Sequence, residues 1–119
     1  MIQLGEKQIL KVVQVKDFGV YVGDEQESVL LPRKYVPAGT GVGDSVEVFI
    51  YRDSSDRLIA TTEEPMLTLG QIGLLRVKEI GKIGAFLDWG LEKDLFLPYK
   101  EQTVQVRPGK SYLVALYID

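Results

Sequence analysis

The chain has 119 residues, 26% of them charged, and a formal net charge of −3. It contains neither cysteine nor histidine, which excludes disulfides, thiolate metal sites and the histidine-based triads of many hydrolases. An acidic chain is repelled by phosphates overall, so nucleic-acid binding would need a locally basic face. No stretch has the pattern of a leader peptide or a membrane span, so we expect a cytoplasmic protein that does not contact a membrane.

The first half of the chain predicts five short strands. Alternating apolar residues, rich in Val and Ile, place these strands at 8–16, 17–23, 27–31, 45–52 and 57–62. Gly19 interrupts the second strand and predicts a bulge or a tight bend, by which small barrels turn corners. The glycine-rich stretch 38–43 has no lysine and precedes no helix pattern, so we interpret it as a connection and not as a phosphate-binding loop.

The second half predicts four strands after a break at residues 63–65, Glu-Glu-Pro. The same alternation places these strands at 67–80, 83–89, 94–97 and 111–118. Tyr117 to Asp119 correspond to Tyr51 to Asp53, where the last hairpin of the first half turns. A fifth strand is therefore missing from the second half. We expect the natural protein to continue into further domains after this chain, and the open barrel edge to favour oligomerisation.

The two halves are copies of one small domain. Phe-Gly-Val-Tyr-Val at 18–22 is echoed by Ile-Gly-Ala-Phe-Leu at 83–87, and the blocks at 29–32 and 43–48 return 66 residues later. Several matches in the same order indicate an internal repeat. The domain organisation predicted is a first domain at 1–63, a linker at 64–67 and a second domain at 68–119.

These residues together resemble a known family. The glycine-kinked second strand, the Leu-Leu-Pro ending the third and the Gly-Asp entering the fourth look like the RNA-binding domain named from ribosomal protein S-one, a small five-stranded barrel of the OB type. The tandem arrangement, with Gly-Ala-Phe-Leu-Asp-Trp-Gly at 84–90, resembles the conserved virulence factor B family of bacteria. The resemblance implies an all-β fold of two OB-type barrels, the second without its last strand. It also implies a longer chain, with a third such domain and a winged-helix domain.

In the resembled domain, RNA lies across an exposed sheet face with aromatic residues on strands two and three and basic residues around them. Phe18 and Tyr21 fall on the two aromatic positions of strand two, whereas in the second copy only Phe86 is kept and Ile83 replaces the other. Prolines replace the usual histidine of strand three in both copies. The cations nearest these strands are Lys16, Arg33, Lys34, Lys82 and Lys100.

Strand parity predicts which of these aromatic side chains face outward. If the neighbouring valines of Tyr21 point into the barrel, then Tyr21 points out, and the same argument applies to Phe86. Phe18 lies across the glycine kink, where parity does not decide its side. Trp89 shares the parity of the inward Leu87 and is expected to pack at a barrel end or against the other domain.

We interpret the chain as a single-stranded RNA-binding module, which could also take DNA, of a bacterial regulator of gene expression. The alternative is a protein-interaction or assembly module in which the barrels serve as rigid spacers. Catalysis is not expected, because carboxylate pairs such as Asp53 with Asp56 and Asp88 with Glu92 lie on expected turns and are typical turn formers. We expect neither a metal site nor a cofactor.

Overall fold

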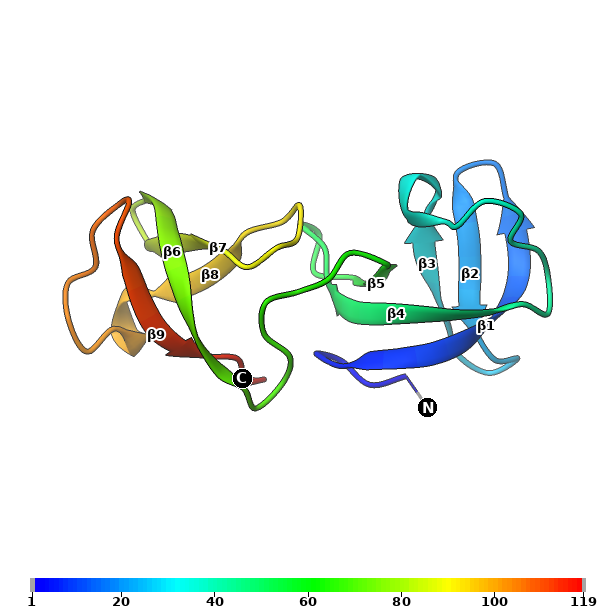
Figure 1. Ribbon diagram of the computed structural model, residues 1–119, viewed down its shortest axis with the longest axis horizontal. Coiled ribbons are helices and arrows are strands. Elements are labelled where there is room, and N and C mark those ends of the chain that lie inside the picture. The colour runs from blue at the N-terminus through cyan, green and yellow to red at the C-terminus, as the bar shows by residue number, and fades with distance from the viewer. Residues whose placement is uncertain (1, 119) are drawn as a thin grey trace. The chain divides into compact units, whose positions relative to one another are not determined.

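The computed structural model describes residues 2–118 and divides the chain into two compact units, Met1–Glu63 and Glu64–Asp119. Figure 1 shows that the regular structure of both units consists of strands. Unit 1 contains β1 (Lys7–Lys16), β2 (Gly19–Gly23), β3 (Ser28–Pro32), a short 3-10 turn η1 (Arg33–Tyr35), β4 (Ser45–Arg52) and β5 (Leu58–Thr61). Unit 2 contains β6 (Ile72–Ile80), β7 (Gly84–Asp88), β8 (Leu95–Pro98), a 3-10 turn η2 (Tyr99–Glu101) and β9 (Ser111–Ala115). In the described part of the chain, no helix is long and apolar enough to span a membrane.

Unit 1 is a closed five-stranded barrel in the order β1-β2-β3-β5-β4, and β4 returns to pair with β1. All of its pairs are antiparallel except β3 with β5, where Leu30 faces Ile59 in a parallel ladder. Closure leaves no free sheet edge, which lets so small a domain satisfy its backbone. The expected all-β, OB-type barrel is confirmed.

The core of unit 1 follows from alternation along the strands. Val20, Val22, Leu31, Val48 and Ile50 all point inward and are at most 3% exposed. Their neighbours along each strand point to the other face, as the two-residue period of a strand requires, and of these Phe49 is also buried, at 1% exposure. The inner faces are therefore occupied by packing, and only the outer faces of the strands are available for binding.

Within residues 64–118, unit 2 is an open four-stranded sheet in the order β8-β7-β6-β9, and the predicted lack of a fifth strand is confirmed for these residues. The prediction of a strand at 111–118 was too long, because β9 ends at Ala115. In unit 1 the equivalent second half of β4 is held by β5. The predicted strand at 67–80 was also too long, since β6 begins at Ile72 after a turn in which Gln71 N donates to Thr68 O at 3.0 Å.

The repeated glycine serves a close approach between strands. A Cβ atom on Gly19 would collide with the carbonyl oxygen of Leu31, and one on Gly84 would collide with that of Leu97. Gly19 also has φ of +151°, which an L side chain rarely adopts. The bulges themselves lie on the neighbouring strands, where the pairing register shifts beside Val13 in β1 and beside Lys78 in β6.

Residues 64–67, expected to form a linker, pack within unit 2. Met66 N donates to Trp89 O at 2.7 Å, and Leu67 is 4% exposed. Trp89 is 5% exposed, and its indole Nε1 donates to Lys93 O at 2.7 Å. This tryptophan is thus a structural anchor and is not available as a stacking surface.

Candidate nucleic-acid interface

The outer face of β1, β2 and β3 carries the first candidate surface. Tyr21 is half-buried on this face, since Val20 and Val22 on either side point into the core. Its cross-strand neighbours are Gln14 on β1 and Leu30 on β3. These side chains form an uncharged row across three strands, with an aromatic ring at its centre.

Phe18 stands beside Tyr21 at the turn between β1 and β2. Its ring is 54% exposed and meets the Tyr21 ring edge-on, with centroids 6.3 Å apart and an interplanar angle of 90°. Arg33 fixes this turn, because its backbone N donates to Phe18 O at 3.0 Å and its Nη1 donates to Asp17 O at 3.4 Å. The fold therefore resolves the ambiguity of Phe18 by placing it outward, next to Tyr21.

Exposed cations lie on the elements next to the turn that carries Phe18. Lys16 pairs with Gly19 across the ladder, and together with Arg33 and Gly39 it lines an open recess of about 490 Å³. Lys34 is also exposed, and its Nζ lies 5.2 Å from the centroid of the Tyr35 ring. Asp17 also lines the recess, so this corner of unit 1 sets Lys16, Arg33 and Lys34 against one carboxylate.

Unit 2 presents a different version of the same face. Phe86 is half-buried and lies opposite Phe96 in the β7–β8 ladder, with ring centroids 5.3 Å apart at 37°. Phe96 is 38% exposed and Tyr99 is 45% exposed. Sequence reasoning missed both of these rings. The parity of Phe96 between Leu95 and Leu97 was the available signal, because those leucines point inward.

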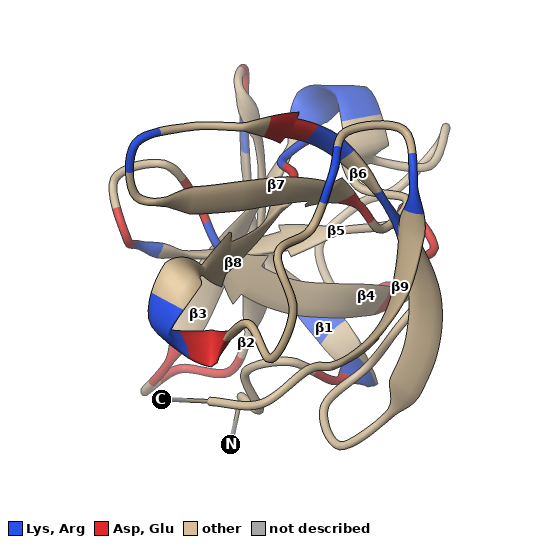
Figure 2. Ribbon diagram, turned by 90° about the vertical axis from the view of Figure 1, so that its left-hand side faces the viewer, with Lys and Arg blue, Asp and Glu red and all other residues tan. Residues whose placement is uncertain are grey.

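The charges around this second face are less favourable for phosphates. Tyr99 occupies the position of Arg33 and donates its hydroxyl to Gly81 O at 2.5 Å, while Glu79 stands where unit 1 has the neutral Gln14. Lys78 is engaged by Asp94 at 3.0 Å, and this hydrogen bond and charge raise the pKa of Lys78. Figure 2 shows basic and acidic residues interspersed along the ribbon of both units.

The remaining predicted cations of unit 2 lie on two turns of the unit. Lys82 is exposed on the turn between β6 and β7. Lys100 lies on η2 next to Glu101, and both residues line a groove on the β8 side of the unit. The candidate face of unit 2 therefore carries more aromatic rings, while Lys78 is paired with Asp94 and Lys100 stands next to Glu101.

The carboxylates considered for catalysis organise turns. Asp53 accepts hydrogen bonds from Arg57 N at 3.0 Å and Ser55 N at 2.8 Å, and these bonds, led by that of Arg57, lower the pKa of Asp53. Asp88 likewise accepts from Gly90 N at 3.1 Å. Among residues 2–118, no three acidic side chains gather closely enough to hold a metal ion.

The sequence is similar to known bacterial proteins. The chain is 33% identical over 91 residues to the uncharacterized protein YitL of Bacillus subtilis (strain 168), covering 76% of this chain and 30% of the relative. It is 30% identical over 82 residues to conserved virulence factor B of Staphylococcus aureus (strain MRSA252), covering 66% of this chain and 27% of the relative. The chain thus spans less than a third of the length of these relatives, and the resemblance to the virulence factor B proteins is confirmed.

A solved structure matches the fold of nearly the whole chain. It is the crystal structure of a multidomain protein with nucleic acid binding domains from Streptococcus pneumoniae TIGR4, with a TM-score of 0.79 and 25% sequence identity over 98% of this chain and 42% of that one. The S1 domain profile matches twice, at residues 4–63 and at residues 69–119. The chain therefore belongs to the S1 domain family and carries one copy of that domain in each of its two units.

Proposed function

We propose that this chain binds single-stranded RNA across the outer face of β1–β3 in unit 1, as part of a bacterial regulator of gene expression. The observation that carries the proposal is the exposed Phe18 ring against Tyr21, with Lys16 at the end of the adjoining β1 ladder and Arg33 bonded through its backbone N to Phe18 O. Stacking of a base on an aromatic ring contributes about 1–3 kcal/mol per base and is largely independent of base identity. The flanking cations add attraction to the phosphates between stacked bases.

The comparisons support this proposal in its coarser form. The structural neighbour from Streptococcus pneumoniae is described as having nucleic acid binding domains. This chain carries two S1 domains. RNA as the preferred strand, a regulatory role, a cytoplasmic site of action and the presence of further domains after unit 2 are parts of the proposal. Binding without turnover is a part of it too, because the carboxylates we considered are committed to turns.

A protein-interaction role is the second candidate, and a separate surface favours it. Ile72, Leu74 and Leu113 are between 64% and 74% exposed on the outer face of β6 and β9, where Leu74 and Leu113 pair directly. In unit 1 the equivalent pair is Ile9 with Glu47, which places a charge in the same position. An apolar outer face of this kind suits a protein partner better than a phosphate backbone.

A salt titration separates the two candidates. Anisotropy of a labelled single-stranded RNA of about 12 nucleotides, within the usual site size of such barrels, measures the affinity. The logarithm of the affinity should fall linearly with the logarithm of salt concentration, with a slope of about −0.7 for each phosphate neutralised, so two cations give about −1.4. DNA of the same sequence tests whether the 2′-hydroxyl is read. Absence of binding at low salt, or affinity independent of salt, would contradict the proposal.

A further inference from the structure

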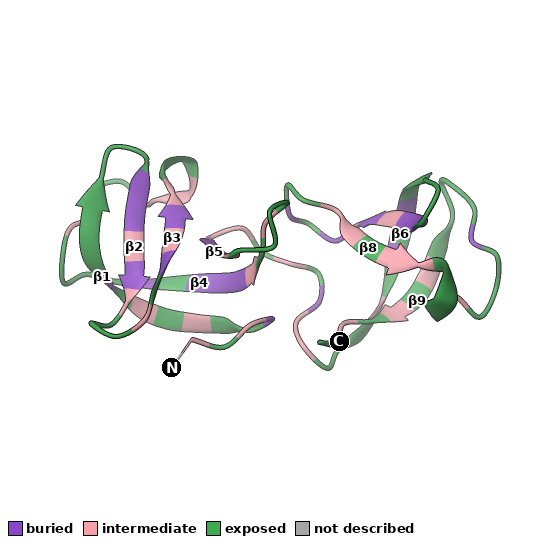
Figure 3. Cartoon of the chain, turned by 180° about the vertical axis from the view of Figure 1, so that it is seen from behind, coloured by how far each residue is buried: buried purple, intermediate pink, exposed green. Residues whose placement is uncertain are grey.

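Two phenylalanine rings lie side by side on the outer face of β7 and β8. Phe86 and Phe96 are direct cross-strand partners, and their ring centroids are 5.3 Å apart at 37°. Figure 3 shows intermediate and exposed residues along β8, where Phe96 is 38% exposed. At the same place in unit 1, Tyr21 lies opposite Leu30, which is not aromatic. The pair of Phe86 and Phe96, here called the aromatic pair, is therefore particular to unit 2.

Glycines hold both rings close to the backbone. A Cβ atom on Gly84 would lie 2.7 Å from Cε1 of Phe96, and one on Gly81 would lie 3.4 Å from Cε2 of Phe86. The Tyr99 hydroxyl donates to Gly81 O at 2.5 Å and ties η2 to the same turn. The rings are thus in place before a ligand arrives, which lowers the entropy lost on binding.

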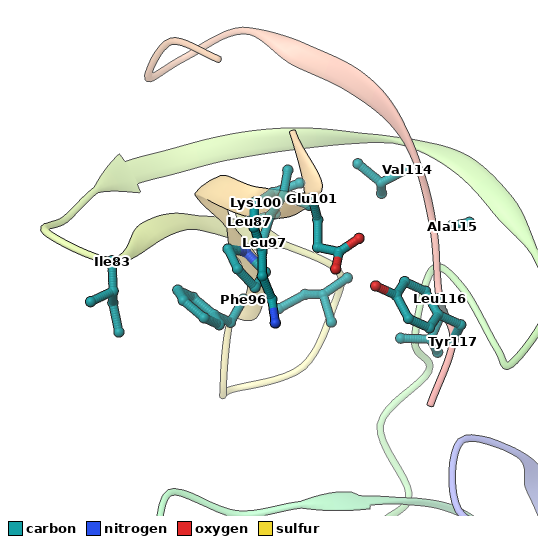
Figure 4. A pocket seen from close by; sticks show the side chains of 12 residues that line it. Ile83, Leu87, Phe96, Leu97, Lys100, Glu101, Val114, Ala115, Leu116 and Tyr117 are labelled. Carbon is teal, nitrogen blue, oxygen red and sulfur yellow. The ribbon is translucent and has the colours of Figure 1, made fainter. Parts of the chain in front are cut away.

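A carboxylate and an ammonium group lie on opposite sides of the aromatic pair. On the β6 side, Glu79 is exposed and is the cross-strand partner of Phe86, so the two side chains are neighbours on one face. Within residues 2–118, no hydrogen bond or salt bridge engages the Glu79 carboxylate. On the β8 side, Lys100 of η2 and Phe96 line the same groove, and Figure 4 shows both on one side of it.

This arrangement matches the parts of a nucleotide. A base stacks on aromatic rings, its edge forms hydrogen bonds with polar side chains, and its phosphate attracts a cation. The ionised carboxylate of Glu79 only accepts hydrogen bonds, so it suits a base edge with two adjacent N–H donors. Guanine has such an edge, formed by N1–H and the 2-amino group. In adenine, cytosine and uracil, an acceptor stands next to the donor and would face the carboxylate.

Unit 1 differs at the position that would contact the base edge. Gln14 lies opposite Tyr21 there, as Glu79 lies opposite Phe86 in unit 2. A glutamine amide both donates and accepts, so it can pair with any of the four bases. Lys34, the equivalent of Lys100, is kept and exposed. The two units therefore share a cation and differ in the group that can read a base.

We propose that the outer face of β6–β8 in unit 2 binds one nucleotide of a single strand and selects guanine through Glu79. The aromatic pair stacks on the base, and Lys100 attracts the phosphate. The Glu79 charge also repels phosphates, so this face adds selectivity, and most of the affinity stays with unit 1. The inference rests on the proposed function, because it requires that the chain binds single-stranded RNA.

The test compares three RNA strands of about 12 nucleotides, within the site size of such barrels, with uridine at all but every third position. That position carries guanine in the first strand, adenine in the second and hypoxanthine in the third. Anisotropy should show the guanine strand binding about fivefold more tightly than the adenine strand. The hypoxanthine strand lacks only the 2-amino group and should bind like the adenine strand. In amide NMR of the full chain, only the guanine strand should shift Glu79, Phe86 and Phe96.

Three variants connect the preference to this face. Glu79→Gln introduces the amide of unit 1 at an exposed position and should abolish the preference for guanine without weakening the adenine strand. Glu47→Gln removes the same charge from an exposed position on β4 and should keep the preference. Phe96→Leu introduces the residue of unit 1 and should weaken the guanine strand alone. Thermal midpoints, compared with the unchanged chain, verify that each variant remains folded.

The outcomes separate this inference from the proposed function. Equal affinities for the three strands, with shifts confined to unit 1, would overturn the selection of guanine and leave RNA binding by unit 1 intact. A preference that persists in Glu79→Gln, or an equal gain in affinity for all strands, would make Glu79 a repulsive charge only. Hypoxanthine equal to guanine would refute the paired contact with N1–H and the 2-amino group. No binding of any strand would overturn the inference and the proposed function together.

Discussion

Replacing Tyr21 with alanine should weaken RNA binding without unfolding unit 1. Loss of one stacked base costs about 1–3 kcal/mol, which corresponds to an affinity about 5- to 160-fold lower. The loss should lie in the upper part of this range, because Tyr21 also supports the Phe18 ring through an edge contact worth about 0.5–1.5 kcal/mol. The core is spared, since Val20 and Val22 carry the inner face of β2.

Anisotropy with labelled single-stranded RNA at fixed salt measures this loss, and the thermal midpoint of unit 1 is followed in parallel. Tyr21→Phe is the matched control, because it keeps the ring and should remain within about twofold of the unchanged chain. Phe86→Ala, the equivalent change in unit 2, should have the smaller effect, since Glu79 and not Gln14 is its neighbour on the adjacent strand. Unchanged affinity in Tyr21→Ala together with loss of binding in Phe86→Ala would refute the reasoning and assign the site to unit 2.

Three further predictions concern charge, backbone and pH. Arg33→Ala should reduce the slope of the logarithm of RNA affinity against the logarithm of salt concentration by about 0.7, whereas Arg33→Lys should keep that slope. An unchanged slope in Arg33→Ala would show that Arg33 does not neutralise a phosphate. Gly19→Ala should destabilise unit 1 by about 1–3 kcal/mol in urea unfolding, because of its φ of +151° and the nearby Leu31 carbonyl, whereas Gly41→Ala, with open space around it, should be nearly neutral. Asp53→Asn should weaken the dependence of stability on acid pH. The pKa of Asp53 is lowered in the folded chain, so the stabilisation from its carboxylate is present above the ordinary value of 3.8 and is lost as the pH falls below it. The unfolding midpoints at pH 6 and pH 3 should therefore differ less in the variant than in the unchanged chain.

The fold was largely predictable from sequence because the repeat shows the pattern of the first four strands twice. Alternation around Val20 and Val22 predicted the inner face of β2, and the alignment of Tyr117 with Tyr51 predicted that unit 2 has no equivalent of β5. Strand ends were less accessible, since they depend on partners. β9 ends at Ala115, three residues before the end of the predicted strand, although the alternation of apolar residues continues to Ile118.

The candidate site was less accessible, because it depends on contacts across strands. Phe96 was overlooked because its equivalent in the first repeat, Leu30, is not aromatic. Its contact with Phe86 depends on the pairing register of β7 and β8, which sequence alone does not give. The bulges lie beside Val13 and Lys78 and not at the glycines, because the glycines mark a close approach between strands. The outward side of Phe18 became visible only in the structure, through its exposure and its edge contact with Tyr21.

The central claim is that nucleic acid lies on the outer face of β1–β3 in unit 1, and backbone amide NMR of the full chain titrated with single-stranded RNA tests it most directly. The account predicts shifts that begin with Phe18, Tyr21 and Arg33 and spread along β1–β3, with much smaller changes in unit 2. Shifts confined to β7, β8 and η2, or to the apolar face formed by Leu74 and Leu113, would contradict it.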